Sequence, residues 1–276
     1  MTDLYAVIGN PIAQSKSPII HKAFAQQSGQ DMDYVPILGE PGRFCEEVDA
    51  WRAKGLRGLN ITAPFKLDAF AYANELPPEA QTAGAVNCLT FEGARARGDN
   101  FDGIGLVRDL IANLGVELRG RRILVLGTGG ATRGLLAPFL REEPARLGVA
   151  YRTEAAASAL AALFPREPAL DFRHYDAFKP GDDAAFDLVV NATSSSLTGA
   201  APPIPPFVFQ PGGLAYDLSY GKGLTPFLRL AREAGVARLA DGVGMLVEQA
   251  AEAFALWRGV RPPTRPLIEK LAIPLV

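Results

Sequence analysis

Hydrophobic and polar positions alternate in short blocks over the first part of the chain, and these blocks predict strands followed by helices. A continuous apolar run that ends in turn residues indicates a buried strand at residues 4–8, and further strands are expected at residues 34–38 and 56–62. Apolar residues at helical spacing predict helices at residues 17–29, 44–54 and 65–74. Ser17 and Pro18 are expected to start the first helix, as its N-cap and first-turn proline, and Gly29 to end it. This alternation is typical of an α/β unit rich in parallel strands.

A second series of elements begins near residue 104. Apolar residues spaced as on a helix predict that residues 104–114 bridge into a second unit. That unit is expected to contain strands at 123–126, 147–151 and 186–190 and a stiff proline-rich loop at 202–206. Near the C-terminus, the nearly uncharged stretch 242–257 predicts a long amphipathic helix.

Composition and charge exclude several classes of protein. The 276 residues are 48% hydrophobic and 21% charged, as in an ordinary globular protein, and the net charge is −2. Proteins that coat nucleic acids or bind membranes through basic patches need a surplus of Lys and Arg. No apolar run approaches the roughly 18–20 residues that cross a bilayer, and no signal-peptide pattern is found. We therefore expect a soluble, cytoplasmic protein without nucleic-acid or membrane partners.

Cysteine and histidine are scarce. Cys45 and Cys88 are too few for a disulfide framework or a cysteine-based zinc cluster. His21 and His174 lie far apart in the sequence, so a histidine metal site is not expected either. The sequence predicts a metal-free protein of a reducing compartment.

The clearest local motif is a cluster of glycines directly after a predicted strand. Glycines let the backbone turn tightly and approach a diphosphate, whose charge meets main-chain N–H groups and the positive end of the following helix. Thr132 occupies the third position of the G-x-G-x-x-G pattern, which weakens the match, and a purely structural turn remains an alternative. The predicted dinucleotide-binding turn comprises Gly127, Thr128, Gly129, Gly130 and Ala131.

The strand after this turn indicates the type of dinucleotide. NAD-selective sites usually place Asp or Glu about 20 residues after the glycine turn, to bind the ribose 2′-hydroxyl. Here the strand ends at Tyr151 and is followed by Arg152 and Thr153. The guanidinium fork of arginine suits a 2′-phosphate, so we predict NADP, although Glu154 could oppose this preference. A surface arginine at a strand end is the structural alternative.

Polar residues gather at four places in the first unit where an α/β fold exposes strand ends, at residues 15–17, 60–66, 84–87 and 99–102. Each has a purely structural interpretation when taken alone. Ser17 can cap a helix, and Lys66 can be a solvated helix residue. Asn87 can form a turn, and Asp102 can cap the helix at 104–114. Only the combination points to a function.

Taken together, six motifs in this order resemble the shikimate dehydrogenase family, and the resemblance covers essentially the whole chain. They are Gly9-Asn10-Pro11-Ile12 with Ser15-Lys16-Ser17-Pro18, Asn60-x-Thr62-x-Pro64-Phe65-Lys66, Gly84-Ala85-Val86-Asn87, Gly98-Asp99-Asn100-x-Asp102-Gly103, Asn191-Ala192-Thr193-Ser194 and Asp241-Gly242-x-Gly244-Met245-Leu246. Motifs in register over a whole chain are far more specific than the glycine turn alone.

The resemblance implies NADP-dependent interconversion of shikimate and 3-dehydroshikimate, a step of chorismate and aromatic amino acid biosynthesis. By the family's pattern, the catalytic lysine is Lys66 and its aspartate partner is Asp102. Serines for the substrate carboxylate are implied at Ser15 and Ser17, and ligands for the substrate hydroxyls at Asn60, Thr62, Asn87, Tyr220 and Gln249. Cofactor contacts beyond the glycine turn are implied at Arg152, Thr153, Ala192, Thr193, Leu218 and Gly242.

The implied chemistry explains these residue types. Ketone reduction needs a proton donor to the forming alkoxide, and a positioned acid or base contributes about 10²–10⁴-fold to such a step. The sequence leaves two roles open for Lys66, as the proton shuttle itself or as an ammonium that stabilises negative charge. Asp102 orients Lys66 in both cases. No metal is required, because an ammonium and hydrogen bonds can polarise the ketone.

Three positions depart from the family's pattern. Phe101 replaces the threonine usual before Asp102, and its ring could reshape the substrate pocket. Tyr151 stands where asparagine is common, and Ala156 stands where a second arginine is frequent. One anchor for the 2′-phosphate is therefore missing, and selectivity for NADP over NAD is expected to be modest.

Two alternatives remain open from the sequence. One is a quinate/shikimate dehydrogenase that uses NAD or NADP, although Arg152 disfavours its NAD form. The other is a non-catalytic dinucleotide-binding sensor, which would have no need for both Lys66 and Asp102. The chain is expected to act as a monomer or homodimer.

The expected architecture is α/β, with two domains around a cleft. Residues 1–103 are expected to form a three-layer α/β domain for substrate binding and catalysis. Residues 241–276 are expected to complete it, since Gln249 must reach the same pocket. Residues 104–240 are expected to form a Rossmann-type, doubly wound NADP-binding domain. Ligands commonly bind in the gap between such domains.

Overall fold

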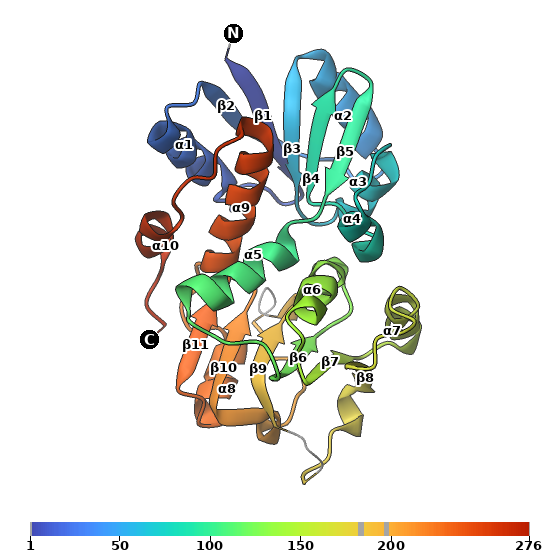
Figure 1. Cartoon of the computed structure of the whole chain (residues 1–276), viewed down its shortest axis with the longest axis vertical. Helices are drawn as coiled ribbons and strands as arrows, with labels where there is room; N and C mark the ends of the chain where they lie inside the picture. Colours follow the sequence, from blue (N-terminus) through green and yellow to red (C-terminus); the bar gives the residue numbers. More distant parts are fainter. Residues whose placement is uncertain (1, 182–184, 196–198, 276) are drawn as a thin grey trace.

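Two β-sheets occupy the upper and the lower half of the structure in Figure 1. The computed structural model describes residues 2–181, 185–195 and 199–275. The strands of the first sheet are β1 (Asp3–Gly9), β2 (Met32–Leu38), β3 (Leu56–Ile61), β4 (Cys88–Glu92) and β5 (Arg95–Asp99). They lie in the order β2-β1-β3-β4-β5. The three strands predicted in this part of the chain are thus found, each within two residues of its expected start and one of its expected end.

The first sheet is mixed, whereas the sequence predicted a unit rich in parallel strands. β1 pairs in parallel with β2 and β3, as expected, but β4 is antiparallel to β3 and to β5. β4 and β5 form a hairpin whose turn contains Gly93 with a φ of 58°, a left-handed conformation that glycine adopts readily. The two strands are short and carry several polar residues, so their sequence lacks the apolar run that marks β1.

Helices cover both faces of this sheet, which confirms the predicted three layers. α2 (Phe44–Ala53), α3 (Lys66–Tyr72) and α4 (Pro78–Ala83) share one apolar core with strand residues such as Ile8 and Leu59. α1 (Ser17–Ser28) and the C-terminal α9 (Val243–Arg258) lie on the other face. There Trp257 of α9 stacks on Tyr5 of β1 at 4.8 Å, and a Cβ added to Gly58 of β3 would lie 2.5 Å from the Trp257 ring.

The second sheet is parallel throughout and has the strand order of a Rossmann fold. Its strands are β6 (Arg122–Leu126), β7 (Arg146–Tyr151), β8 (Leu170–His174), β9 (Phe186–Asn191), β10 (Phe209–Asp217) and β11 (Arg238–Asp241). They lie in the order β11-β10-β9-β6-β7-β8. β7 and β8 follow on one side of β6, whereas β9, β10 and β11 follow on its other side, and all neighbouring strands are parallel. This is the doubly wound arrangement that the sequence predicted, and it exposes a ligand crevice at the strands' carboxyl ends.

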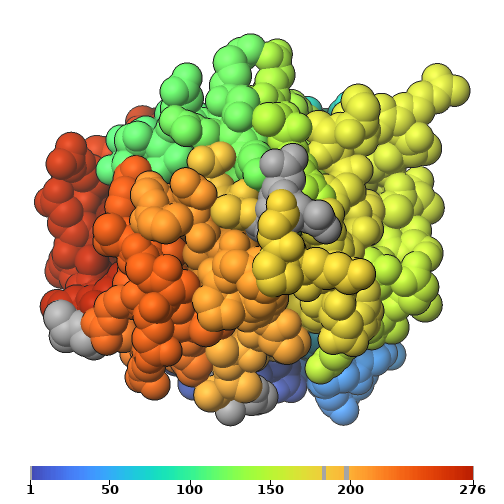
Figure 2. Space-filling view, turned by 90° about the horizontal axis from the view of Figure 1, so that it is seen from below, coloured from blue at the N-terminus to red at the C-terminus, as the bar shows by residue number. Residues whose placement is uncertain are grey.

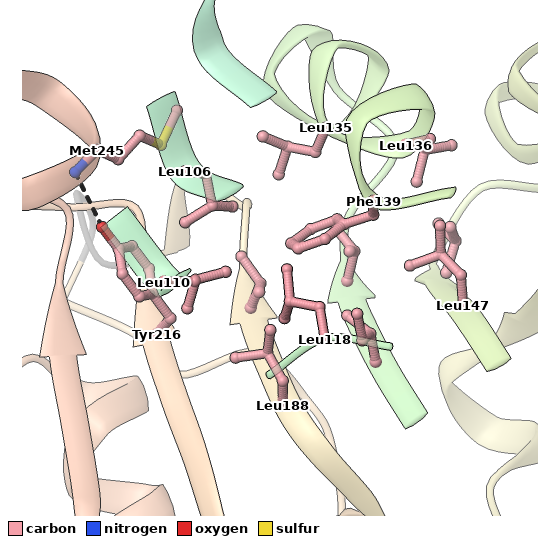
Figure 3. Close-up of a cluster of buried hydrophobic side chains, with 14 of the residues drawn as sticks. Leu106, Leu110, Leu118, Leu135, Leu136, Phe139, Leu147, Leu188, Tyr216 and Met245 are labelled. Carbon is pink, nitrogen blue, oxygen red and sulfur yellow. Dashed lines mark hydrogen bonds between the residues drawn. The ribbon is translucent and has the colours of Figure 1, made fainter. Parts of the chain in front are cut away.

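One of the two apolar cores of this half lies between the sheet and α5 (Asp102–Arg108), α6 (Gly130–Arg141) and the π-helical turn η1 (Asp109–Asn113). Figure 3 shows Leu106 and Leu110 facing the strands beside Leu135 and Phe139 of α6. α7 (Glu154–Ala161), α8 (Pro226–Glu233) and the short 3₁₀ turns η2 (Tyr175–Ala177) and η4 (Pro206–Val208) complete this half. Seen from below, its surface is formed mostly by the yellow and orange second half of the chain (Figure 2).

α5 and α9 connect the two halves and pack against each other, and α9 also packs against α1 and α10 (Arg265–Leu271) (Figure 1). The predicted helix at 242–257 is confirmed to within one residue at each end. The predicted helix at 104–114 begins two residues earlier and widens into a π-helical turn at Asp109. Within the described ranges, every helix falls short of the length and apolar character needed to cross a membrane.

Candidate active site

A cavity of about 230 Å³ lies where the carboxyl ends of the first sheet face α6 and the loops of the second sheet. Its lining comes from the loops after β1, β3 and β10, the segment before β4, and the starts of α3, α5, α6 and α9. The polar side chains on its wall are Gln14, Ser15, Ser17, Asn60, Thr62, Lys66, Asn87, Asp102, Tyr220 and Gln249. The cavity is therefore polar where the first sheet meets it.

Lys66 and Asp102 form an ion pair on the wall of this cavity. Lys66 begins α3, Asp102 begins α5, and Lys66 Nζ lies 2.5 Å from Asp102 Oδ2. The second oxygen, Oδ1, accepts a hydrogen bond from Asn87 Nδ2 at 2.8 Å. The Asp102 main-chain N–H donates to Asn100 Oδ1 at 3.1 Å. Hydrogen bonds thus hold both oxygens of the Asp102 carboxylate. The Lys66 ammonium is bound to this fixed carboxylate on the cavity wall.

The amide side chains of Asn87 and Gln249 are joined by a hydrogen bond on the cavity wall. Asn87 Nδ2 also donates to Gln249 Oε1 at 3.4 Å, and Asn87 Oδ1 accepts from the Phe101 main-chain N–H at 2.9 Å. Gln249 Nε2 donates to the Leu246 carbonyl at 2.8 Å, which orients it on α9. Gln249 of the C-terminal helix and Asn87 of the first unit therefore lie in one pocket, as expected.

The serines lie in the loop between β1 and α1. The Ser17 N–H donates to Ser15 Oγ at 3.3 Å, so the loop folds on itself beside the cavity. The predicted N-cap role of Ser17 is wrong, because Lys16 is the N-cap and Ser17 is the first helical residue. The hydroxyl of Ser17 does not cap the helix and lies on the cavity wall instead.

The glycine turn connects β6 to α6 with the geometry of a phosphate cradle. Gly127 has a φ of 101°, a left-handed value that favours glycine. A Cβ added to Gly129 or Gly130 would meet no described atom within 4 Å, so open space lies in front of the helix N-terminus. Thr132 Oγ donates to the Gly127 carbonyl at 2.9 Å, which explains a threonine at this position. The residues present fit a dinucleotide diphosphate.

The residues after β7 lie on the surface. Arg152 and Thr153 are exposed, and Thr153 is the N-cap residue of α7. Tyr151 donates its hydroxyl to Glu154 Oε2 at 2.5 Å, and this bond raises the pKa of Tyr151. The Glu154 carboxylate is therefore bound to Tyr151, and Arg152 is exposed in the same loop.

Acidic and amide side chains at the ends of β9, β10 and β11 hold the loops that carry the remaining predicted residues. Asn191 Oδ1 accepts from the Thr193 N–H at 3.1 Å, and Asp217 Oδ1 accepts from the Ser219 N–H at 3.0 Å. Asp241 Oδ1 accepts from the Val243 N–H at 3.2 Å, and burial raises the pKa of Asp241. Sequence reasoning assigned these three no role, although each is an Asn or Asp that ends a strand, a position where such side chains often bind the next loop.

Comparison with known proteins identifies the family. A model described as the shikimate dehydrogenase substrate binding domain matches residues 7–89, and one described as the Shikimate 5'-dehydrogenase C-terminal domain matches residues 242–271. The NADP(+) shikimate dehydrogenase of Dechloromonas aromatica is 52% identical over 276 residues, which cover 100% of both chains. The chain belongs to the shikimate dehydrogenase family. The family prediction is confirmed, and with it an enzyme rather than a non-catalytic sensor.

Solved structures of the family share this fold. An Ael1 enzyme from Pseudomonas putida is 55% identical with a TM-score of 0.93, and each chain is covered in full. Shikimate 5-dehydrogenase from Thermus thermophilus, solved with NADP(H) and shikimate, is 34% identical with a TM-score of 0.83, over 97% of this chain and 98% of that one. The predicted two-domain α/β class is thus confirmed for a shikimate dehydrogenase.

The residues implied by the family resemblance fall into two groups in space. Both implied catalytic residues and all seven implied substrate ligands line the cavity, as do Ala131, Leu218 and Gly242. The other implied cofactor residues lie outside the cavity wall, along the carboxyl edge of the second sheet; they are Gly127, Thr128, Gly129, Gly130, Arg152, Thr153, Ala192 and Thr193. Phe101, expected as a substitution that could reshape the pocket, is not among the lining residues.

Proposed function

We propose that this member of the family catalyses the reversible, NADPH-dependent reduction of 3-dehydroshikimate to shikimate in chorismate and aromatic amino acid biosynthesis. The observation that carries the proposal is the ion pair of Lys66 and Asp102 on the wall of a polar cavity beside the glycine turn. The relative from Dechloromonas aromatica, 52% identical over its whole length, is an NADP(+) shikimate dehydrogenase, which supports the same reaction and cofactor.

Lys66 and Asp102 carry the proton chemistry in this proposal. When the ketone is reduced, its oxygen gains negative charge and requires one proton. The Lys66 ammonium stabilises that charge, donates the proton and regains one from solvent. Asp102 holds the ammonium 2.5 Å from its Oδ2 and is itself fixed through Asn87. In shikimate oxidation the same groups act in reverse, and the hydroxyl proton passes to neutral Lys66.

The remaining polar wall recognises the substrate. The Ser15 and Ser17 hydroxyls are assigned to the carboxylate, on which they act as neutral donors. The hydroxyls of the ring are assigned to Asn60, Thr62, Asn87, Tyr220 and Gln249. A site built from such groups rejects analogues that lack a hydroxyl, because its buried polar atoms would then remain unpaired.

The glycine turn and the carboxyl edge of the second sheet hold the dinucleotide. Main-chain N–H groups at residues 127–131 are assigned to the diphosphate, and Arg152 with Thr153 to the 2′-phosphate. The loops bearing Ala192, Thr193, Leu218 and Gly242 are assigned to the nicotinamide half. When bound, NADPH supplies the hydride that the protein's own side chains cannot supply.

The proposed working unit is one chain, as a monomer or homodimer in the cytoplasm, because Lys66, Asp102 and Gln249 of the same chain meet in one cavity. Its substrate domain is residues 1–103 completed by 241–276, and its NADP domain is residues 104–240. The packing of α9 against α1 supports this division, because it attaches the C-terminal segment to the first unit.

The test is a matrix of two substrates and two cofactors. Purified protein is supplied with shikimate or quinate and with NADP or NAD, and formation of reduced cofactor is followed by its near-ultraviolet absorbance. The highest kcat/KM is expected for shikimate with NADP, and the reverse reaction is expected with 3-dehydroshikimate and NADPH. Equal or better turnover of quinate would instead indicate a quinate/shikimate dehydrogenase, and no turnover of either substrate would contradict the proposal.

A further inference from the structure

Tyr34 lies directly behind the cavity wall and contacts one of the residues that form it. It belongs to β2, at the edge of the first sheet, and is not part of the cavity lining. Its hydroxyl donates a hydrogen bond to Oδ1 of Asn60 at 2.7 Å. Asn60 is 5% exposed, on β3, and faces the cavity. Tyr34 therefore acts on the site from behind, through Asn60, and its hydroxyl also lies near the side chain of Ser17 on the cavity wall.

The amide of Asn60 has one allowed orientation in these surroundings. Its Nδ2 donates to the main-chain carbonyl of Asn87 at 3.4 Å, and a carbonyl oxygen can only accept. Exchanging Nδ2 and Oδ1 would place two oxygen atoms against each other at this contact. Oδ1 consequently faces Tyr34, which donates to it. One N–H of Asn60 is left for a ligand in the cavity.

The ring of Tyr34 is held in place from the side of α1. It stacks on His21 with ring centroids 4.2 Å apart and planes 6° from parallel. His21 is fully buried, and burial lowers its pKa to about 3, a shift that nearby Asn60 opposes without meeting hydrogen-bond geometry. The ring that supports Tyr34 is thus neutral. Burial also raises the pKa of Tyr34 well above its usual range, so its hydroxyl keeps the proton that it donates.

We propose that Tyr34 is a positioning residue that fixes the amide of Asn60 as a hydrogen-bond donor to one ring hydroxyl of the substrate. The inference rests on the proposed function, because it assigns Asn60 a substrate that carries hydroxyls. Without the Tyr34 hydroxyl, Oδ1 loses its shorter hydrogen bond, and the amide is held only by the 3.4 Å contact of Nδ2 with the Asn87 carbonyl. The N–H that faces the substrate is then less firmly positioned, which weakens substrate binding more than turnover.

The decisive experiment is a double-mutant cycle with Tyr34→Phe and Asn60→Ala. Tyr34→Phe keeps the ring that stacks on His21 and removes only the hydroxyl. We expect KM for shikimate to rise about three- to tenfold, the effect of one hydrogen bond, with kcat and the KM for NADP within about twofold. In the Asn60→Ala background the same substitution should change KM for shikimate no further. Additive effects of the two substitutions would overturn the proposal, as would an unchanged KM in Tyr34→Phe.

Tyr5→Phe is the matched control, because Tyr5 also lies in this aromatic cluster but its hydroxyl faces Arg258 at 3.5 Å. We expect wild-type KM values for both ligands in this variant. An equal rise in KM for shikimate in Tyr5→Phe and Tyr34→Phe would show a general effect of loosened packing and would overturn the assignment. Failure of the proposed function is distinguishable, since the wild-type enzyme itself would then not turn over shikimate.

Asn60→Asp tests the donor role without altering the aromatic rings. The carboxylate has the same shape and still accepts from Tyr34, but it offers no N–H to the substrate and places an oxygen against the Asn87 carbonyl. We expect KM for shikimate to rise at least as much as in Asn60→Ala, with the KM for NADP unchanged. Wild-type affinity for shikimate in Asn60→Asp would contradict donation by Asn60.

Discussion

The ammonium of Lys66 and the carboxylate of Asp102 meet at 2.5 Å although they are 36 positions apart in the sequence and begin different helices. α3 follows the central strand β3, whereas α5 leads out of the first unit toward the second sheet. The pair therefore lies where the first unit joins the second. Because Asn87 binds the other oxygen of Asp102, the carboxylate cannot rotate away from Lys66 without losing a second hydrogen bond.

Lys66→Ala should lower kcat by about 10²–10⁴-fold, because it removes the positioned proton donor. The dissociation constant for NADP should stay within about threefold of wild type, since the glycine turn lies on a different sheet. Steady-state kinetics measure kcat, and isothermal titration calorimetry measures the dissociation constant for NADP. Lys22→Ala, on the exposed surface of α1, is the control and should behave as wild type. An unchanged kcat in Lys66→Ala would remove this residue from the mechanism.

Arg152→Ala should weaken NADP by about 10–100-fold, the effect of a charged hydrogen bond to phosphate, and should leave NAD nearly unaffected. The reason is that Arg152 lies exposed after β7, whereas the neighbouring carboxylate of Glu154 is bound by Tyr151. Comparing KM for the two cofactors in the variant, with exposed Arg166→Ala as the control, measures this. An equal loss for NADP and NAD would reject the assignment to the 2′-phosphate.

Much of the fold could be predicted from the sequence because its central strands are buried on both faces. β1 and β6 contain continuous apolar runs. The glycines after β6 predict the tight turn of the chain from this strand into the next helix. β4 and β5 escaped prediction, since each strand has only five residues and polar residues interrupt its apolar pattern. The π-helical turn at Asp109 has no local signal at all. It is stabilised by long-range hydrogen bonds, such as that from Tyr216 to Asp109 Oδ2 at 2.8 Å.

The cavity wall was predictable for a different reason. Its residues occur in short motifs whose order matches a known family, so their proximity did not have to be worked out from the fold. Tyr34 and Asn100 were assigned no role because they bind residues of the cavity wall from behind, Tyr34 the side chain of Asn60 and Asn100 the main chain of Asp102. Such contacts depend on which strands are neighbours, for instance β2 beside β1, and periodicity along the chain does not reveal that.

Gly103→Ala should lower the free energy of unfolding by about 2 kcal/mol. α5 crosses α6 so closely that a Cβ at Gly103 would lie 2.2 Å from the Gly134 carbonyl. Overpacking typically costs about 1–3 kcal/mol, and so direct a clash with main chain should outweigh the ~1 kcal/mol that alanine gains in a helix. Urea denaturation measures the change. In Gly212→Ala, where the added Cβ would meet no described atom within 4 Å, stability should change by less than about 0.5 kcal/mol. Equal stability of both variants would contradict the close crossing.

His21→Phe should make stability less dependent on acid pH. Burial lowers the pKa of His21 from 6.5 to about 3, so the folded state excludes a proton that the unfolded state binds. Because the pKa of His21 is lower in the folded state, the free energy of unfolding is highest above about pH 6.5. It falls as the pH is lowered toward 3, by at most about 1.4 kcal/mol per pH unit. Denaturant titrations near pH 7 and about pH 5 should show a smaller loss in His21→Phe than in wild type, whereas surface-located His174→Phe should retain the wild-type loss. Identical losses in all three proteins would contradict a neutral, buried His21.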